Sequence, residues 1–339
     1  MGETGPMQNT TTQLDRSRHD SIAILIPVFN DWESLARLLP EVDAALGAAS
    51  LEGHVIVVDD GSTVAAPDEF GRHSYFHLST VEVIRLRCNL GHQRAIAVGM
   101  AHLSKIGVGA RAIIIMDGDG EDRPEDIPRL VAELYGQQGD VVFAARTKRT
   151  EGHTFRFMYF VYRLVFWLLT GAEVRGGNFS ALSCSALPRL VVNPDLWNHY
   201  AATVLRSRMR LSTLPLPRGK RYGGKSHMRY SRLVAHGLSA VAVFSEVVGA
   251  RLVIFFSGVL AILLFLLGME LFTRLYNTYA IPDWAAIATA VLILFTMQGL
   301  LSILIFALTV LGRRSQAKVV PLRDAEAFIE SVLRLPNQA

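Results

Sequence analysis

Two long uncharged segments near the C-terminus constrain this chain more than any other feature of its sequence. Leu252 to Met269 is 18 residues without a charged side chain, and Trp284 to Gly312 is 29. Helices over these segments would be about 27 and about 43 Å long, against a hydrocarbon core about 30 Å thick. A buried core helix seldom needs so long an uncharged run. The sequence therefore predicts two membrane-spanning helices, at about residues 252–272 and 284–311.

Cations are concentrated on the outer flanks of this predicted pair of spans. The connecting segment, Glu270 to Asp283, has one cation, Arg274. The outer flanks contain Arg218, Lys220, Arg221, Lys225, Arg229, Arg232, Arg251, Arg313, Arg314, Lys318 and Arg323. Because Lys and Arg are retained on the cytoplasmic side, this pattern predicts a hairpin with both termini in the cytoplasm. No basic stripe interleaved with aromatic residues appears in the sequence, so a nucleic-acid partner is not predicted.

The rest of the chain has the pattern of an α/β domain. Short apolar runs, at residues 22–28, 54–59, 81–86, 112–117 and 140–145, alternate with segments whose apolar residues have helical spacing. This alternation predicts a mostly parallel sheet covered by helices on both faces. The expected regions are a disordered tail (1–20), the α/β domain (21–227), an interfacial amphipathic helix (228–250), the transmembrane hairpin (251–312) and a cytoplasmic tail (313–339). Within that tail, Ala325 to Leu335 is expected to form a short amphipathic helix.

Acidic residues follow two of the predicted central strands. Asp59 ends the second strand, and Asp117-Gly-Asp-Gly-Glu-Asp122 follows the fourth. Ligands of open parallel sheets bind beyond the carboxyl ends of the strands. In an extended backbone, Asp117, Asp119 and Glu121 would project to the same side, and their oxygens suit Mg²⁺ or Mn²⁺. The sequence therefore predicts a hard-metal site that keeps coordination positions open for substrate phosphates.

Two competing motifs fail on their details. An EF-hand loop that begins at Asp117 needs Gly and Glu at its sixth and twelfth positions, where the chain has Asp122 and Pro128. Gly219 to Ser226 has the spacing of a Walker A loop, which should follow a buried parallel strand. Leu214-Pro-Leu-Pro217 precedes it instead, and proline cannot donate to a central ladder. The sequence predicts neither an EF-hand nor a P-loop NTPase.

Taken together, the motifs resemble those of the GT-A family 2 glycosyltransferases. They are Ile26-Pro-Val-Phe-Asn30, Val58-Asp-Asp-Gly-Ser-Thr63, Asn89-Leu-Gly-His92 and Asp117-Gly-Asp-Gly-Glu-Asp-Arg-Pro-Glu125. More narrowly, the chain looks like the polyprenyl-phosphate mannosyl- and glucosyltransferases, including the dolichol-phosphate mannose synthases. The resemblance implies a GT-A fold and a metal-dependent, inverting transfer of a hexose from a UDP- or GDP-sugar to polyprenyl phosphate.

The resemblance also implies roles for individual residues. The nucleotide-sugar would contact Pro27, Phe29, Asn30, Asp31, Asp59, Asp117 and Gly118. Mg²⁺ or Mn²⁺ would be bound by Asp117, Asp119 and Glu121. The acceptor phosphate would be held by Arg146, Arg156, Arg221, Lys225 and Ser226. The residues expected to act directly in transfer are Asp119, Arg146 and Arg221.

The chain departs from the family pattern at four places. Glu121 stands where the family has Gln, and His92 and His227 stand where it has Lys. Gly177-Asn-Phe-Ser180 replaces the usual Gly-Asp-Phe-Arg. These segments are expected to contact the donor or the acceptor, so the sequence leaves the identity of the sugar open. It also leaves open whether the protein forms a homo-oligomer.

Two other functions are considered beside transfer to a lipid phosphate. A transferase acting on a glycolipid hydroxyl would need a general base, for which Asp122 is the nearest candidate. A catalytically silent membrane scaffold would have no need of Asp59, Asp117 and Asp119. A phosphate monoester has a second pKa of about 6, so it is already anionic at neutral pH and attacks without a base. A lipid-phosphate acceptor therefore requires the fewest catalytic groups from this sequence, because it needs no general base.

Overall fold

The computed structural model describes residues 21–67, 70, 74–107, 109–146, 153–173, 176–223, 230–276, 283–314 and 318–335. Within these ranges, the side chains at 146, 153–159, 230–234, 236, 274, 283, 286 and 310–314 are not described. The chain forms two compact units, which are taken separately here. The first contains residues 1–156, 174–243 and 319–339, and the second contains 157–173 and 244–318.

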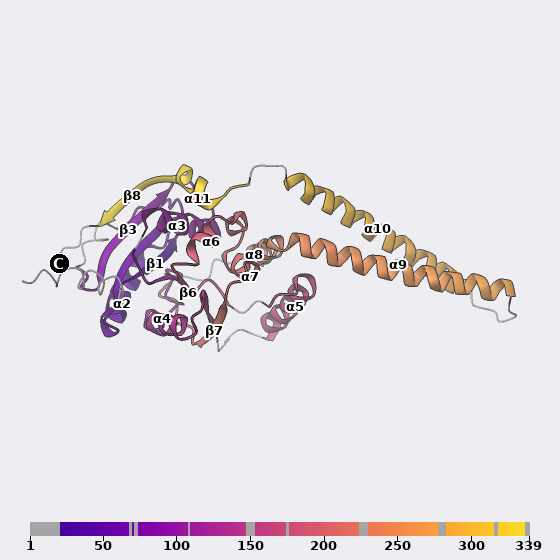
Figure 1. Cartoon of the computed structure of the whole chain (residues 1–339), viewed down its shortest axis with the longest axis horizontal. Helices are drawn as coiled ribbons and strands as arrows, with labels where there is room; N and C mark the ends of the chain where they lie inside the picture. Colours follow the sequence, from indigo (N-terminus) through magenta and orange to yellow (C-terminus); the bar gives the residue numbers. More distant parts are fainter. Residues whose placement is uncertain are drawn as a thin grey trace, which may run out of the picture. The chain divides into compact units, whose positions relative to one another are not determined.

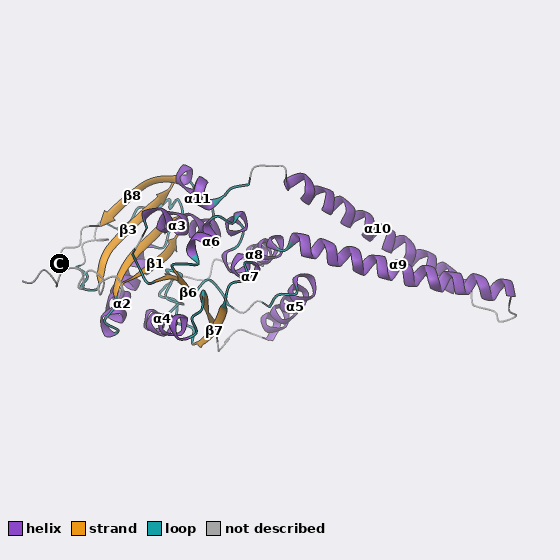
Figure 2. Ribbon diagram, viewed as in Figure 1, coloured by secondary structure: helices purple, strands orange, loops and turns teal. Residues whose placement is uncertain are grey.

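The first unit is built on an eight-stranded sheet with the order β7-β5-β6-β4-β1-β2-β3-β8 (Figures 1 and 2). The strands are β1 (Ser21–Val28), β2 (Glu52–Asp59), β3 (Leu78–Leu86), β4 (Ala112–Ile115), β5 (Val141–Arg146), β6 (Ser180–Ser183), β7 (Leu211–Leu216) and β8 (Ile329–Leu335). The central strands β4, β1, β2 and β3 are parallel, as are β5 and β7. The antiparallel pairs are β4–β6, β5–β6 and β3–β8. The predicted α/β fold with a mostly parallel sheet is confirmed.

Helices cover both faces of the sheet because the central strands are apolar on both sides. In β1, Ile22, Ile24 and Ile26 face one hydrophobic core, and Ala23 and Leu25 face the other. The first core also contains residues of α2 (Trp32–Ala48) and α4 (Ile127–Gly136). The second contains residues of α3 (His92–Ile106), α6 (Leu187–Val191) and α7 (Tyr200–Arg206). Two short 3-10 helices, η1 (Pro124–Asp126) and η2 (Pro194–Trp197), precede α4 and α7. This layering brings the ends of β1, β2 and β4 to one edge of the sheet.

The C-terminal segment forms part of the sheet. The expected amphipathic helix over Ala325 to Leu335 is wrong, because α11 (Pro321–Asp324) and the 3-10 helix η3 (Ala325–Phe328) lead into strand β8. Figure 1 shows β8 in yellow beside the purple β3. Five of its seven residues are exposed. Tertiary pairing with β3 decides its conformation.

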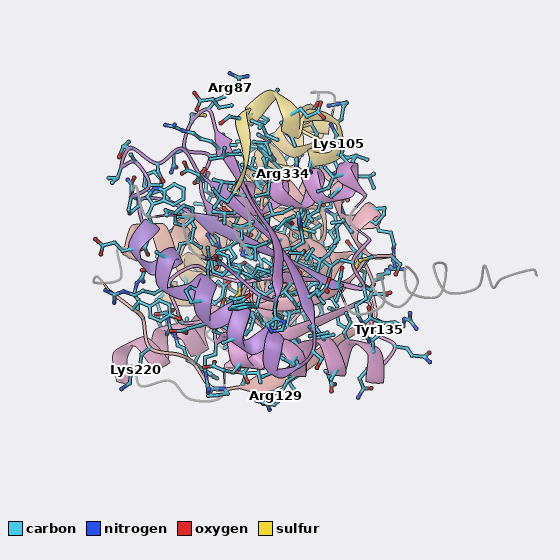
Figure 3. The ribbon with its side chains drawn as sticks, turned by 90° about the vertical axis from the view of Figure 1, so that its left-hand side faces the viewer. Arg87, Lys105, Arg129, Tyr135, Lys220 and Arg334 are labelled. Atoms are coloured by element: carbon cyan, nitrogen blue, oxygen red, sulfur yellow. The ribbon has the colours of Figure 1, made fainter. Side chains whose placement is uncertain are left out.

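A buried carboxylate fastens this segment to the sheet. Glu82 on β3 is 1% exposed, and its two oxygens contact His102 Nε2 at 2.5 Å and Arg334 Nε at 3.0 Å. Arg334, labelled in Figure 3, stands opposite Glu82 in the β3–β8 register. A second ion pair joins Lys105 Nζ to Glu326 Oε1 at 2.7 Å. The C-terminal segment therefore neutralises charge that the strand beside it buries.

The second unit is a helical hairpin with one further helix. Its long helices, α9 (Ser245–Tyr276) and α10 (Asp283–Arg314), pack against each other (Figure 1). At one close approach, a Cβ on Gly299 would lie 2.4 Å from the ring of Phe256, so a larger residue there would separate the helices. Arg251 Nη1, on α9, donates to Leu168 O at 2.9 Å near the end of α5 (His153–Thr170).

The two long helices have the properties of membrane spans. Within Ser245–Thr273 and Ile287–Thr309, the most apolar 18-residue windows have mean hydropathies of 2.8 and 2.5. Large apolar side chains point outward, with Phe265 66% and Phe295 72% exposed. A core helix of a soluble protein would bury such side chains. The predicted helices at 252–272 and 284–311 are present, and each is longer than predicted. The predicted interfacial helix at 228–250 is divided between α8 (Tyr230–Val243) and the start of α9.

The contact between Glu82 and Arg334 is expected to stabilise the first unit measurably. Arg334→Met removes the arginine beside a buried carboxylate and should lower the free energy of unfolding by about 1–2 kcal/mol. Glu330→Gln removes the Arg85–Glu330 pair on the same two strands, which is half-exposed, and should cost less than about 0.5 kcal/mol. Thermal unfolding of the full chain in detergent compares the two variants. Equal losses would mean that β8 is held by backbone pairing alone.

Candidate functional site

The loops after β1, β2 and β4 meet at one edge of the sheet. The backbone connects them, because Asp60 N donates to Val28 O at 2.8 Å and Met116 N donates to Leu25 O at 3.1 Å. The sequence predicts that its acidic residues lie close together beyond the carboxyl ends of these strands. The sheet order, with β1 between β4 and β2, brings them there.

The loops after β1 and β2 are clamped together by Asn30. Its side-chain Oδ1 accepts from Thr63 N at 2.9 Å and from Val64 N at 3.1 Å, while its own N–H donates to Ser62 Oγ at 2.8 Å. Asn30 has a φ of 53°, a conformation that Asn tolerates better than most residues. Asp59, 4% exposed, completes the clamp by accepting from Ser62 N at 2.9 Å. Both residues therefore have a structural role at this edge.

The other residues predicted near the nucleotide differ in exposure. Phe29 is 47% exposed, so its ring is available for stacking. Pro27 is buried within β1, and Asp31 is half-buried just before α2. Gly118 faces Ile26 and Val28, where an added Cβ would lie 3.3 Å from Ile26 Cγ2. Phe29 is the member of this group that presents the most surface to a ligand.

Asp60 is a site-forming residue that the sequence analysis did not select. It is 3% exposed, and its two oxygens accept from Leu90 N at 2.7 Å and from Gly91 N at 2.9 Å. Burial raises the pKa of Asp60, and the two N–H donors oppose that rise. Asp60 thereby fixes the start of α3, which carries His92. The signal in the sequence was the second acid of the Asp-Asp-Gly-Ser motif.

The acidic loop after β4 turns instead of continuing as a strand. β4 ends at Ile115, and Gly120 has a φ of +83°. Asp117 N donates to Asp122 Oδ2 at 2.9 Å, and Glu121 N donates to Asp119 Oδ1 at 3.0 Å. The extended backbone that would have projected three carboxylates to one side is not observed, so that argument is wrong. The loop closes on itself because its backbone N–H groups bond to its own carboxylates.

The chain between β7 and Tyr222 lies against this loop. Gly219 N donates to Glu121 O at 2.8 Å, and Tyr222 N donates to Asp119 O at 3.1 Å. Arg218 pairs with the Glu121 carboxylate, and Arg221 Nη2 lies 3.4 Å from Asp119 Oδ2. The two arginines therefore bring positive charge onto the acidic loop from a segment about a hundred residues away in the sequence.

Carboxylate repulsion is evident at Asp119. Burial raises the pKa of Asp119, and neighbouring Asp117 raises it further, whereas Arg221 opposes the rise. At Asp117, His92 Nε2 lies 3.1 Å from Oδ1. Burial would lower the pKa of His92, but Asp117 and other nearby carboxylates outweigh burial and raise it. The edge thus has excess negative charge that favours cations.

Two of the three predicted metal ligands fit a hard dication. Asp117 and Asp119 present carboxylate oxygens that repel each other, and a dication would relieve that repulsion. Glu121 fits less well, because Arg218 donates a hydrogen bond to its carboxylate, whereas Arg221 approaches Asp119 only to 3.4 Å. Among the described residues, no group of three His, Cys, Asp or Glu side chains is arranged to hold a metal. Mg²⁺ commonly uses one or two carboxylates together with substrate phosphates, which agrees with two aspartates here.

A hydrogen-bonded chain links His92 to three further residues. Tyr200 N donates to Gln93 Oε1 at 2.7 Å, and Gln93 Nε2 donates to Asn178 Oδ1 at 3.0 Å. Asn178 Nδ2 lies 2.8 Å from His92 Nε2, which accepts from it only when that nitrogen carries no proton. Because the backbone N–H of Tyr200 can only donate, Gln93 must present its Oε1 to it, and this fixes the orientation of the Gln93 and Asn178 side-chain amides. Ser180 Oγ in turn bonds Asn178 O at 2.8 Å. Three of the departures from the family pattern, His92, Asn178 and Ser180, therefore belong to one network.

The predicted acceptor residues are only partly described. Arg221 lies at the acidic loop, as reported above. Arg146 ends β5, and Arg156 lies in α5, but the side chains of both are outside the described part of the chain, as are Lys225 and Ser226 entirely. Beside the acidic loop is a small pocket lined by Glu121, Asp122, Ala144, Phe179 and Arg218. Ala144, which lines this pocket, lies two residues before Arg146 on β5.

The chain matches known proteins over the part that forms this site. Residues 23–190 match the family model described as glycosyl transferase family 2. The undecaprenyl-phosphate 4-deoxy-4-formamido-L-arabinose transferase of Klebsiella pneumoniae is 27% identical over 270 residues, 78% of this chain and 79% of that protein. The protein of the same name from Erwinia tasmaniensis is 33% identical over 130 residues, 38% of each chain.

Among solved structures, the chain aligns with glucosyl-3-phosphoglycerate synthase from Mycobacterium tuberculosis, in complex with Mn²⁺, UDP-glucose and phosphoglyceric acid. It aligns with a TM-score of 0.49 and 16% identity over 73% of this chain and 86% of that one. The family match includes the ends of β1, β2 and β4 and the whole acidic loop. The resemblance found in the sequence is confirmed: residues 23–190 form a domain of glycosyl transferase family 2, and the chain is a glycosyltransferase.

Proposed function

We propose that this protein is a membrane-bound, inverting glycosyltransferase that uses a divalent metal to transfer a hexose from a UDP- or GDP-sugar to polyprenyl phosphate. The observation that carries the proposal is the apposition of Asp119 and Arg221, 3.4 Å apart, at the carboxyl edge of the sheet. Acidic and basic groups meet there in a chain that also has two apolar helices of membrane length. The names of the relatives, which specify undecaprenyl phosphate, support this acceptor.

The two halves of the site suit the two phosphates of the reaction. Asp117 and Asp119 would hold Mg²⁺ or Mn²⁺, which stabilises the negative charge of the departing nucleoside diphosphate. Arg221 brings a permanent cation to the same place, where it can bind a phosphate oxygen. Arg146 and Arg156, with Lys225 and Ser226, remain proposed contacts of the acceptor phosphate. The acceptor is an anion and attacks directly, so the chain has to supply placement and charge.

The structure disfavours an acceptor hydroxyl. Such an acceptor needs a base, and Asp122 was the candidate. Asp122 is 3% exposed, and one of its oxygens accepts from Asp117 N. A carboxylate buried and bonded in this way is poorly placed to take a proton from a substrate.

The connectivity of the chain supports a hairpin topology. Helix α8 precedes α9, strand β8 follows α10, and both belong to the first unit. The two spans therefore begin and end on the side of the membrane where this unit lies. Cations flank the outer ends of the spans, which favours the cytoplasmic side for this unit and for both termini.

The transfer reaction can be tested directly. Membranes that contain the full chain are incubated with a panel of labelled nucleotide sugars and undecaprenyl or dolichyl phosphate. Label should enter the organic phase, survive mild base and be released by mild acid. Asp119→Ala should lower the rate at least about 100-fold, whereas Glu52→Ala, at the start of β2, should stay within about twofold of wild type. Label found only in water-soluble products would refute the lipid acceptor.

The raised pKa of Asp119 predicts that activity and stability are opposed at this residue. Folding raises this pKa above its usual 3.8, so the ionised group lowers the stability of the metal-free protein at neutral pH. Asp119→Asn should therefore abolish transfer and, in EDTA, keep or raise the unfolding temperature by about 1–3 °C. The difference should disappear below about pH 4, where the group is protonated in both states. A loss of stability at neutral pH would mean that Arg221 outweighs the repulsion.

The topology predicts which exposed sites a membrane-impermeant maleimide can reach. In a Cys88→Ser, Cys184→Ser background, a cysteine is placed at Tyr276, at the end of α9, or at Phe76, in the first unit. These residues are 74% and 85% exposed, so access to the two is well matched. In intact spheroplasts, the position 276 cysteine should react and the position 76 cysteine should react only after lysis. The reverse pattern would place the first unit outside the cytoplasm.

A further inference from the structure

We propose that Glu121 and Arg218 are a positioning pair that holds Arg221 at the site, and that Glu121 is not a metal ligand. This inference rests on the proposed function for its effect on transfer, but the pair itself is a property of the fold. It replaces the role that the family resemblance implied for Glu121. It also gives Arg218, which had no role at the site, a function in the reaction.

The contacts around Arg221 form a short arch. One foot of the arch is the hydrogen bond from Gly219 N to Glu121 O, and the other is the bond from Tyr222 N to Asp119 O. Lys220 and Arg221 lie between these feet. Lys220 is exposed at the edge of the ribbon (Figure 3), whereas Arg221 reaches Asp119. The arch therefore sets which of the two cations faces the acidic loop.

The glycines on both sides allow the arch to lie close to the loop. A Cβ on Gly219 would lie 2.3 Å from Gly120 O, and a Cβ on Gly120 would lie 2.4 Å from the Tyr222 ring. Arg37 Nη1 donates to Tyr222 O at 3.3 Å, and the Tyr222 hydroxyl donates to Glu41. The second foot is thus held from α2 as well. The first foot has the Glu121–Arg218 ion pair beside its backbone bond.

The negative charge of Glu121 allows it to form an ion pair with Arg218 in place of binding a metal. Its side chain is 19% exposed and that of Arg218 is 33% exposed, so the pair is partly shielded from water. The usual Gln at this position is neutral and could not neutralise an arginine. A cation bound at Glu121 would have to displace the hydrogen-bonded Arg218, whereas Asp119 faces Arg221 at 3.4 Å and Asp117 faces His92 at 3.1 Å. Pairing of Glu121 with Arg218 keeps a dication at the two aspartates and leaves the arch in place.

Metal affinity separates the two roles of Glu121 because they predict opposite effects. Full-length protein in detergent is titrated with Mn²⁺ alone, and free Mn²⁺ is measured by electron paramagnetic resonance. For a positioning pair, Glu121→Gln and Arg218→Gln should each change the Mn²⁺ dissociation constant by less than about threefold. If Glu121 were a ligand, Glu121→Gln would weaken Mn²⁺ by about tenfold or more, and Arg218→Gln would tighten it by freeing the carboxylate. That second pattern overturns the proposal.

Charge reversal gives an independent test of the pair. Glu121→Arg and Arg218→Glu should each lower the unfolding temperature and lower kcat/KM for transfer by about tenfold. The double variant should regain both to within about threefold of wild type, which no metal ligand replaced by arginine could do. Additive losses in the double variant would overturn the proposal. Glu125→Gln and Lys220→Gln remove an exposed acid and an exposed cation beside the arch and are the matched controls, expected to change nothing.

The two proposals fail in different ways. If wild type transfers no sugar to polyprenyl phosphate, the proposed function fails, while unfolding of the single and double variants still decides whether the pair exists. If wild type transfers sugar but charge reversal does not restore activity, the positioning pair fails and the proposed function stands.

Discussion

Repulsion among carboxylates on one loop is the constraint around which this edge of the fold is organised. Asp117, Asp119, Glu121 and Asp122 lie within six consecutive positions after β4. Each is compensated by a different partner: Asp122 accepts a backbone N–H, Glu121 meets Arg218, Asp119 meets Arg221, and Asp117 meets His92. The negative charge that remains uncompensated at Asp117 and Asp119 makes this edge of the sheet suitable for a dication.

This compensation also explains why the second half of the first unit is needed at the site. The acidic loop belongs to the half that contains the parallel strands, but its arginines come from the segment after β7. The pairing of β7 with β5 brings that segment to the carboxyl edge. Strands β5 and β7 therefore extend the sheet and also position Arg218 and Arg221 beside the acidic loop. The neutral network through Gln93 and Asn178 forms another side of the site, and it contains residues at which this chain departs from its family.

The C-terminal strand connects the membrane hairpin to the same fold. The chain leaves the first unit after α8, forms α9 and α10, and returns to pair with β3. Arg334 in this strand pairs with Glu82 on β3, and this pairing offsets the desolvation cost of burying the Glu82 carboxylate. A segment that looks like a tail in the sequence thus completes the sheet, so the chain enters and leaves the helical hairpin from the first unit.

The sequence by itself determined the features that depend on local pattern. Alternating apolar runs gave the five main strands to within a few residues, uncharged length gave the two spans, and short motifs gave the family and the acidic edge. The tertiary structure alone decided which groups meet. Glu121 and Arg218 are 97 positions apart, and Glu82 and Arg334 are 252 apart, so no local periodicity relates them. The turn after Ile115 and the strand at Ile329–Leu335 were missed for the same physical reason: their conformations are set by partners distant in the sequence.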